Sequence, residues 1–293
     1  MNGFLNVNKP TGMTSHDVVN AVRRMAGTRR VGHAGTLDPM ATGVLVMALG
    51  AATRLVQFID GSDKTYRATL RLGETTTTYD ADGDLLQRRP VTVSQADIEA
   101  ALEGFRGNIT QIPPMYSAIK VKGQKLYNLA RQGKEIERAP RPVTIHRLDV
   151  LEWALPDVTL EVVCSAGTYI RSLAHDLGQT LGCGAHLRVL TRTAAGVFRL
   201  GDSHTLEALD ALAQAGRLAE VLLPPETALV SLPVIVLTPE QKQAVRFGQT
   251  ITLDNPPNAE LAQARDAAGR FVAVLLSVEA SVWRPKLVFS SAD

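Results

Sequence analysis

The segment from Gly32 to Gly43 contains a single acidic side chain, Asp38, in a setting suited to chemistry. Its three glycines indicate a constrained loop rather than a helix or strand, because glycine adopts backbone conformations that other residues avoid. Pro39 disfavours the helical conformation for the residue before it, which holds the carboxylate in an extended, presented geometry. A lone carboxylate on such a loop can act as a nucleophile, but it can equally cap a helix or close an Asx turn. The loop alone therefore names no reaction.

The elements that must hold this loop are predicted from the spacing of apolar residues. Residues 44–49 form an apolar run with the length of a buried strand, directly after the loop. Residues 4–9 alternate like a short strand, and Thr14 has the spacing of a helix start. Arginines on and just past that helix, Arg30 among them, place positive charge beside Asp38, where a phosphate backbone would have to lie.

Two further side chains could reach the same site. Residues 64–72 alternate like a strand with Tyr66 on the face that would be buried, where a tyrosine is usually core packing. Residues 143–153 and 158–164 are predicted to form a hairpin, and an amphipathic helix with Arg171 in its first turn follows. Arg171 would then lie where a ligand meets the end of the sheet, although an arginine at such a position can also be a plain surface residue.

Composition limits the class of protein. The 293 residues suffice for one large domain and a small second one, and a hydrophobic content of 45% is that of a folded protein. The net charge of +2 argues neither for nor against nucleic acid, but residues 116–147 hold eight bases against two acids. This is a local patch suited to phosphates, or else a solvated loop. Two cysteines cannot form a metal quartet or a disulfide framework. Without a recognisable signal peptide or membrane-spanning stretch, we expect a soluble protein of the reducing cytoplasm.

A change of pattern near Ser231 predicts two domains, residues 1–230 and residues 231–293. The stretch from 204 to 223 has a helical, acidic pattern that two prolines then break. After Ser231 the pattern favours one short helix and several strands, hence a small β-rich domain. This region contains no motif that specifies a function, and a generic β appendage explains it as well.

Five blocks within residues 4–200 resemble the TruB family of tRNA pseudouridine synthases. The resemblance implies an α+β fold, with a mixed, largely antiparallel sheet in the catalytic domain (the pseudouridine synthase fold) and a small β-rich, PUA-like RNA-binding domain at the C-terminus. It also implies isomerisation of the uridine at position 55 in the T loop of tRNA, without a cofactor. The five blocks are the loop 32–43, the strand 64–72, and the segments 112–120, 165–178 and 184–198.

The resemblance also implies roles for the site residues. Asp38 would be the catalytic residue, and Arg171 the partner whose ion pair keeps it charged and aims one oxygen at the sugar. Tyr66 would stack beneath the target base and assist proton removal. A site that excludes water needs apolar and aromatic walls, which Tyr66, Tyr169 and Leu190 would supply. Whether Asp38 attacks the sugar, attacks the base or abstracts a proton is left open.

The target uridine is stacked inside folded tRNA and must be extruded, and we expect His33 to fill the gap by stacking. We expect no metal, because the histidines lack the spacing of metal ligands. The expected partner is the T arm and elbow of tRNA, bound by a monomer without membrane association. The candidate RNA-binding cations are Lys9, Arg30, Lys120, Lys122 and Arg141.

Two other functions fit part of the pattern. A non-catalytic tRNA-binding folding chaperone would unfold and release the tRNA elbow. A hydrolase would use Asp38 as a general base, but it would want a second acid nearby, and none stands out in the sequence.

Overall fold

The computed structural model describes residues 1–117, 119–121 and 123–289, in which nine strands form the main sheet. Its strand order is β1-β3-β12-β4-β11-β10-β7, with β2 paired to β3 and β13 paired to β12. Every pair in it is antiparallel except β3 with β12. The predicted α+β class and mixed, largely antiparallel sheet are confirmed. The strands are β1 (Gly3–Lys9), β2 (Val31–Ala34), β3 (Thr42–Leu49), β4 (Lys64–Leu72), β7 (Gly107–Gln111), β10 (Arg141–Ala154), β11 (Asp157–Cys164), β12 (Ala185–Ala195) and β13 (Phe198–Arg199).

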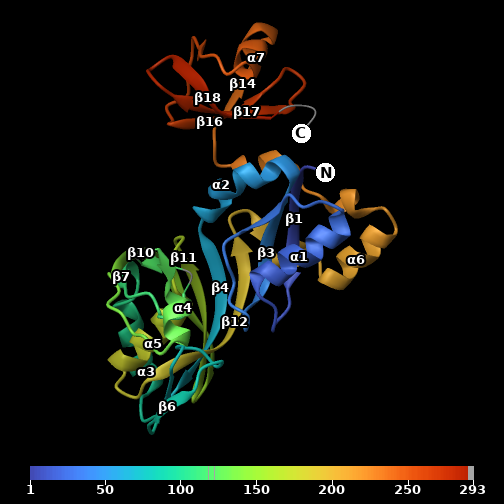
Figure 1. The fold of residues 1–293 in the computed structure, drawn as a ribbon. Coiled ribbons are helices and arrows are strands. Elements are labelled where there is room, and N and C mark those ends of the chain that lie inside the picture. The colour runs from blue at the N-terminus through green and yellow to red at the C-terminus, as the bar shows by residue number, and fades with distance from the viewer. Residues whose placement is uncertain (118, 122, 290–293) are drawn as a thin grey trace.

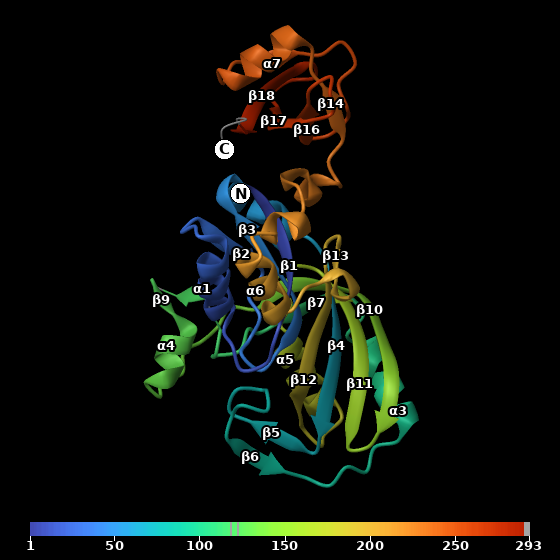
Figure 2. The same cartoon turned by 90° about the vertical axis from the view of Figure 1, so that its right-hand side faces the viewer.

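Strands β4 and β12 lie side by side in the middle of the sheet (Figure 2). In β4 the alternation seen in the sequence becomes an alternation of burial, with Tyr66, Ala68, Leu70 and Leu72 all buried. Strand β12 was not predicted, because two register shifts against β4 interrupt its alternation. The pairing places Leu190 opposite Ala68 and Arg192 opposite Tyr66.

Helices pack against the sheet (Figure 1). Helix α1 (Ser15–Ala26) begins as predicted, with Thr14 and Asp17 forming a reciprocal capping box, and it ends at Gly27 with a φ of 59°. Helix α5 (Ile170–Thr180) follows the β10–β11 hairpin and packs against β12 and β4. The remaining helices of this part are α2 (Val56–Asp60), α3 (Gln95–Glu103), α4 (Leu126–Arg131) and α6 (Leu206–Gln214), with 3-10 helices η1 (Gly50–Leu55), η2 (Leu200–Asp202), η3 (Leu218–Val221) and η4 (Pro225–Leu229).

Two small hairpins stand outside the main sheet. The first joins β5 (Glu74–Thr76) to β6 (Leu85–Arg88) and lies at the foot of the sheet in Figure 2. The second joins β8 (Lys120–Val121) to β9 (Gln124–Lys125), just before α4.

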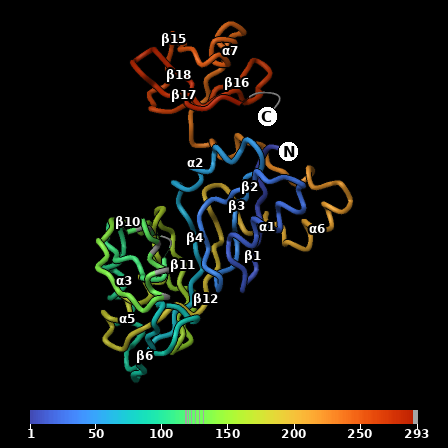
Figure 3. Tube along the Cα trace, viewed as in Figure 1, coloured from blue at the N-terminus to red at the C-terminus, as the bar shows by residue number. Residues whose placement is uncertain are grey.

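The residues after η4 form a separate sheet with the order β14-β16-β17-β18-β15 and one helix, α7. The trace in Figure 3 shows the chain entering this unit by a single connection. Arg54, on η1, contacts this unit. Its Nη1 donates to the carbonyl of Val288 at 2.8 Å, and its guanidinium lies 5.6 Å from the Phe289 ring centroid. Its elements are β14 (Val234–Val236), α7 (Pro239–Arg246), β15 (Ile251–Thr252), β16 (Leu261–Arg265), β17 (Phe271–Ser277) and β18 (Val282–Val288).

One local prediction is wrong. The glycine-rich segment is not a loop from its start, because residues 31–34 form β2, paired antiparallel with β3. Hydrogen bonds to a neighbouring strand outweigh the local preference of Gly32 here. The irregular part of the segment is therefore residues 35–41, between β2 and β3. No helix of the described residues is both long and apolar enough to cross a membrane.

Candidate active site

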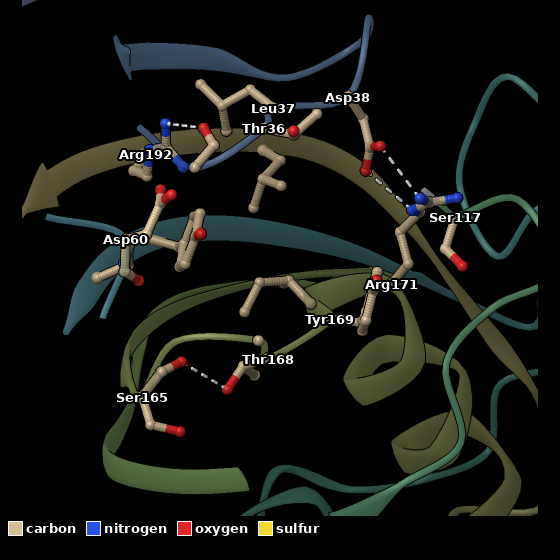
Figure 4. A pocket seen from close by; sticks show the side chains of 16 residues that line it. Thr36, Leu37, Asp38, Asp60, Ser117, Ser165, Thr168, Tyr169, Arg171 and Arg192 are labelled. Atoms are coloured by element: carbon tan, nitrogen blue, oxygen red, sulfur yellow. Dashed lines mark hydrogen bonds and ion pairs between the residues drawn. The ribbon is translucent and has the colours of Figure 1, made fainter. Parts of the chain in front are cut away.

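A pocket of about 260 Å³ opens between the Asp38 segment, strands β4 and β12, and the start of α5 (Figure 4). Figure 4 shows Asp38 and Arg171 at one end of it and Asp60 and Arg192 toward the other. The structure thus brings together the residues predicted to meet there, from segments far apart in the chain. The lining includes Asp38, Tyr66, Tyr169, Arg171 and Leu190 from the sequence analysis, together with Asp60, Lys64, Ser117 and Arg192.

The Asp38 segment is held by side chains of α1 and β1 that bond to its main chain. The hydroxyl of Ser15, at the start of α1, accepts from the amide of Leu37 at 2.9 Å and donates to its carbonyl at 3.0 Å. Lys9 donates to the carbonyl of Pro39 at 3.2 Å, so β1 also holds the residue next to the carboxylate. Where the segment enters β3, Gly43 has a φ of 99°, and a Cβ there would lie 2.2 Å from the carbonyl oxygen of Arg192. Only glycine permits this approach of β3 to β12.

Arg171 joins three segments with one guanidinium. Its Nη2 donates to Asp38 Oδ1 at 3.1 Å, and its Nε lies 3.0 Å from Asp38 Oδ2, which makes a two-point pairing. The same Nη2 donates to the carbonyl of Tyr116 at 2.7 Å, and Nη1 donates to the carbonyl of Thr78 at 3.3 Å. The Arg171 side chain is 5% exposed while that of Asp38 is 34% exposed, so the arginine is the buried support and the carboxylate is presented to the pocket.

The start of α5 is itself tied to β7. Gln111, which is buried, accepts from the amide of Tyr169 at 3.0 Å and donates to its carbonyl at 3.3 Å. Ser172 donates to the carbonyl of Ile112 at 2.8 Å. These bonds fix the first turn of α5 and therefore the base of the Arg171 side chain.

Asp80 is the acid that sequence reasoning did not find. Its Oδ2 lies 3.4 Å from Arg171 Nη1, so Arg171 stands between two carboxylates. Asp80 is buried and also accepts from the Thr78 hydroxyl and from the amide of Asp82. In the sequence it is one of three acids in a polar turn, and no local signal separates it from Asp82 and Asp84.

The electrostatics of Asp38 follow from these neighbours. Burial in the pocket raises the pKa of the Asp38 carboxyl above its usual value of 3.8, and the negative charge of Asp80 raises it further. The Arg171 guanidinium opposes both effects by stabilising the charged form. Desolvation and Asp80 thus favour the neutral form of Asp38, and the Arg171 guanidinium against it favours the charged form.

The other end of the pocket is built from buried cations. Arg192, which is 1% exposed, donates from Nε to the carbonyl of Val44 at 2.7 Å and from Nη2 to that of Gly35 at 2.8 Å. Lys64 donates to the carbonyls of residues 59, 60 and 62, and burial lowers its pKa to about 8. Tyr66 lies across the strand pair from Arg192, and burial raises its pKa while the guanidinium opposes that rise.

The other predicted contacts divide into those that line the pocket and those that do not. Tyr169 and Leu190 line it with Tyr66, as expected of its walls. His33 lies on β2 and is not among the lining residues. Its Nδ1 is buried without a partner among the described residues, and burial lowers the pKa of its imidazole. The imidazole thus lies on the strand that leads into the Asp38 segment, outside the pocket lining.

The predicted RNA-binding cations are not all on the surface. Lys9 is fully buried and donates to the carbonyls of Pro10, Met13 and Pro39, so its assignment to a surface patch is wrong. Arg30 and Arg141 are exposed, as such a patch requires. Lys120 lies on β8, and Lys122 lies outside the described residues.

Comparisons with known proteins agree with this geometry. The N-terminal domain of TruB family pseudouridylate synthases matches residues 23–170, and the C-terminal domain of tRNA pseudouridylate synthase B matches residues 171–230. Two solved structures share the fold, both at 26% identity over 99% of this chain. One is an H/ACA ribonucleoprotein bound to a substrate RNA that contains 2′-deoxyuridine, with a TM-score of 0.77 over 86% of the matched chain. The other is an archaeal Nop10–Cbf5 complex, with a TM-score of 0.75 over 87%. Fold and site together define a pseudouridine synthase.

Curated relatives narrow this class to one family. The tRNA pseudouridine synthase B of Dehalococcoides mccartyi strain 195 is 46% identical over 99% of this chain and 97% of its own length. That of Pseudomonas aeruginosa is 44% identical over 94% of this chain and 91% of its own length. The chain belongs to the TruB family of tRNA pseudouridine synthases and is an enzyme.

Proposed function

We propose that this enzyme converts the uridine at position 55 in the T loop of tRNA to pseudouridine, with Asp38 as the catalytic carboxylate acting on a flipped-out nucleotide. The observation that carries the proposal is the position of Asp38: a partly exposed carboxylate at the end of a pocket, paired at two points to a buried arginine. The matched relatives are named for pseudouridine formation in tRNA, which supplies the substrate class.

The reaction moves one bond and adds nothing. The bond from uracil N1 to the ribose C1′ breaks, the uracil turns, and C5 bonds to C1′, while the proton on C5 leaves and N1 gains one. Asp38 would attack the sugar, attack the base or remove a proton, and each role needs the charged carboxylate. The two-point pairing to Arg171 keeps that charge and fixes the direction of both oxygens.

The walls of the pocket serve the detached base. Tyr66, Tyr169 and Leu190 give it apolar and aromatic surface and displace water that would otherwise capture the sugar. We propose that the Tyr66 hydroxyl, which lies beside the Arg192 guanidinium, assists removal of the C5 proton. His33, next to the pocket on β2, is proposed to stack in the gap that the extruded uridine leaves.

Asp80 bears on the hydrolase alternative. A hydrolase would need a second acid free to hold or activate water near Asp38. Asp80 is close, but it is buried and bound to Arg171, Thr78 and the Asp82 amide. Its contacts favour holding the arginine over activating water, which supports isomerisation.

The C-terminal sheet is proposed to form its own PUA-like RNA-binding domain from residue 231, following a catalytic domain of residues 1–230. Residues Arg284 and Lys286 are exposed on β18, where they could contact a phosphate backbone. We further propose that the enzyme acts as a cytoplasmic monomer on the T arm and elbow of tRNA, with Arg30, Lys120, Lys122 and Arg141 contributing to the RNA-binding surface.

The deciding experiment replaces Asp38 with Asn. This keeps the shape of the side chain but removes the negative charge, so pseudouridine formation in an unmodified tRNA transcript should fall by about 10⁴-fold or more. Binding of the same transcript should be largely kept, because only one side chain in the pocket changes. Mapping of the modified position in the wild-type reaction checks position 55. Product formed by the Asn variant at the wild-type rate would end the assignment of Asp38, whereas a wild-type protein that binds the transcript without forming product would favour the folding-chaperone alternative.

A further inference from the structure

Helix α5, which carries Arg171, starts without a cap of its own. Four other helices, α1, α3, α6 and α7, begin at a serine or threonine whose side chain accepts from an amide of the first turn. The residue before α5 is Tyr169, whose side chain makes no such bond, and the first turn of α5 contains no acid. Arg171 also places a positive charge in that turn, where the helix dipole disfavours one. The sequence of α5 itself therefore does not secure the turn that carries Arg171.

Gln111, at the edge of the main sheet, supplies the missing support. It is the last residue of β7 and is 2% exposed. Its side-chain oxygen accepts from the amide of Tyr169 at 3.0 Å, and its side-chain nitrogen donates to the carbonyl of Tyr169 at 3.3 Å. One side chain thus binds both main-chain groups of the residue at which α5 begins. Two bonds to one residue fix its orientation as well as its position.

The segment that follows Gln111 adds further bonds to the same turn. The carbonyl of Ile112 accepts from the Ser172 hydroxyl at 2.8 Å, and the carbonyl of Tyr116 accepts from Arg171 Nη2 at 2.7 Å. Residues 111–116 therefore contact α5 at its start, at Ser172 and at the guanidinium of Arg171. The base and the tip of the Arg171 side chain are held by one segment of the chain.

We propose that Gln111 is a positioning residue for the reaction, which holds the first turn of α5 so that Arg171 meets both oxygens of Asp38. This assignment deepens the proposed function and rests on it, because it takes Asp38 as the reactive carboxylate. Gln111 is not among the residues that line the pocket, so it acts through Arg171. The two contacts between Arg171 and Asp38 measure 3.0 and 3.1 Å, so a shift of the turn by about 1 Å would break at least one of them.

The pKa of Asp38 reports whether Arg171 is in place. Burial and Asp80 raise the pKa of the Asp38 carboxyl, whereas Arg171 and Lys9 lower it. If the first turn of α5 loosens, Arg171 opposes the rise less, and the pKa of Asp38 increases further. The charged and titratable groups that face Asp38 are Arg171 on α5, Asp80 in the turn after β5, Lys9 on β1, Tyr66 on β4 and Tyr169 before α5. Both phenols have a raised pKa and stay neutral in acid, so they do not shift the acid titration of Asp38 by charge.

The first test removes both bonds from Gln111 to Tyr169. Gln111→Met keeps an unbranched side chain but has no amide. We expect kcat for pseudouridine formation to fall about tenfold or more, because Arg171 and with it the reacting carboxylate are misplaced. The acid limb of the plot of kcat/KM against pH should move to higher pH. Equilibrium binding of the tRNA transcript should change far less than kcat, because the rest of the RNA-binding surface is kept.

The C-terminal sheet offers a matched control. Gln263 is also 2% exposed, and its side-chain nitrogen donates to the carbonyls of Leu229 and Leu232 at 2.9 and 3.1 Å. Gln263→Met removes a comparable pair of buried bonds, so both variants should lose stability in thermal unfolding. Only Gln111→Met should lower kcat and move the acid limb. Equal kinetic effects of the two substitutions would contradict the proposal.

A milder variant keeps the test available if Gln111→Met does not fold. Ser172→Ala removes only the bond to the Ile112 carbonyl, which secures the same turn to the same segment. It should lower kcat and move the acid limb in the same directions as Gln111→Met, by smaller amounts.

The decisive experiment measures Asp38 without any reaction. Carbon-13 NMR of protein labelled at its aspartate carboxyl groups follows each carboxyl against pH, and Asp38→Asn identifies the signal of Asp38. The pKa of Asp38 should be higher in Gln111→Met and Ser172→Ala than in the wild type, and unchanged in Gln263→Met. An unchanged pKa in both α5 variants would overturn the assignment. A raised pKa with an unchanged kcat would support the position of Gln111 and count against the proposed role of Asp38, so the two failures are distinguishable.

Discussion

The two ends of the active-site pocket both contain a buried arginine, yet the two arginines have different partners. Arg171 is bound to the side-chain carboxylates of Asp38 and Asp80, one of which is presented to the pocket. Arg192 is bound to the main-chain carbonyls of Gly35 and Val44. A guanidinium paired with a carboxylate sets the charge and direction of a reactive group. A guanidinium paired with carbonyls fixes the backbone that forms the wall. The two arginines are similarly buried, so their partners distinguish the two ends. We call the end with Arg171 the chemical end and the end with Arg192 the structural end.

The same conservative substitution at both ends tests this distinction, and the larger effect on rate is expected at Arg171. Arg171→Lys keeps the positive charge but cannot reproduce the planar two-point pairing, so the carboxylate should be misaligned. We expect kcat for pseudouridine formation to fall about 100-fold or more, the usual cost of a misplacement near 1 Å. Some stability should be lost as well, because Arg171 also donates to the carbonyls of Tyr116 and Thr78. Turnover near the wild-type rate would remove Arg171 from the chemistry.

At the structural end the readout is stability. Arg192→Lys leaves at least one of the Gly35 and Val44 carbonyls without its donor inside the protein. An unsatisfied buried acceptor costs about 1–3 kcal/mol, so the free energy of unfolding should fall by that amount in urea titrations. The distinction between the ends breaks down if Arg192→Lys is as stable as the wild type and loses only rate.

Asp80 allows a finer test at the chemical end. Its negative charge raises the pKa of Asp38, so Asp80→Asn should lower that pKa. The proposed mechanism needs the charged form of Asp38, so activity should then persist to lower pH. The acid limb of the plot of kcat/KM against pH should move to lower pH. Looser positioning of Arg171 should also reduce kcat at neutral pH, by about tenfold. An acid limb that stays in place or moves up would show that Asp80 does not act on Asp38 through its charge.

The smallest expected effect concerns Lys64. Burial lowers its pKa in the folded protein to about 8 from a usual value of 10.5. Between these pH values the unfolded chain binds more protons at Lys64 than the folded protein does. The contribution of Lys64 to stability therefore increases as pH rises through that window and is lost as pH falls through 8. The difference in unfolding free energy between wild type and Lys64→Met should therefore grow in favour of the wild type from pH 8 to pH 10, by no more than about 1.4 kcal/mol per pH unit. A difference that does not vary with pH would show that Lys64 keeps its ordinary pKa.

Local patterns predicted those parts of the fold that local forces decide. The capping box at Thr14, the alternation of β4 and the hairpin of β10 with β11 are all visible in short windows of sequence. Strand β12 was missed because its register shifts are set by its two neighbours, and β2 was missed because pairing with β3 overrides its glycine.

The candidate site shows the same limit. Asp38 and Arg171 were found through a family resemblance, since nothing within either segment predicts that residues 133 positions apart will meet. Asp80 contacts Arg171, and Lys9 is buried against Pro39, so both depend on residues far away in the chain. A short window of sequence does not contain these partners. The charge of Lys9 suggested a surface role, but its ammonium is buried and donates to the carbonyls of Pro10, Met13 and Pro39.

The close contact at Gly43 has a bearing on how RNA enters. Strands β3 and β12 pair in parallel there. The main chain of Arg192 occupies the space that a side chain at position 43 would need. A shift of one strand against the other would disrupt this pairing and displace the pocket residues that β12 carries. If the proposed extruded uridine enters the pocket, we therefore expect any movement that admits it to occur in the turn after β5 and not between β3 and β12.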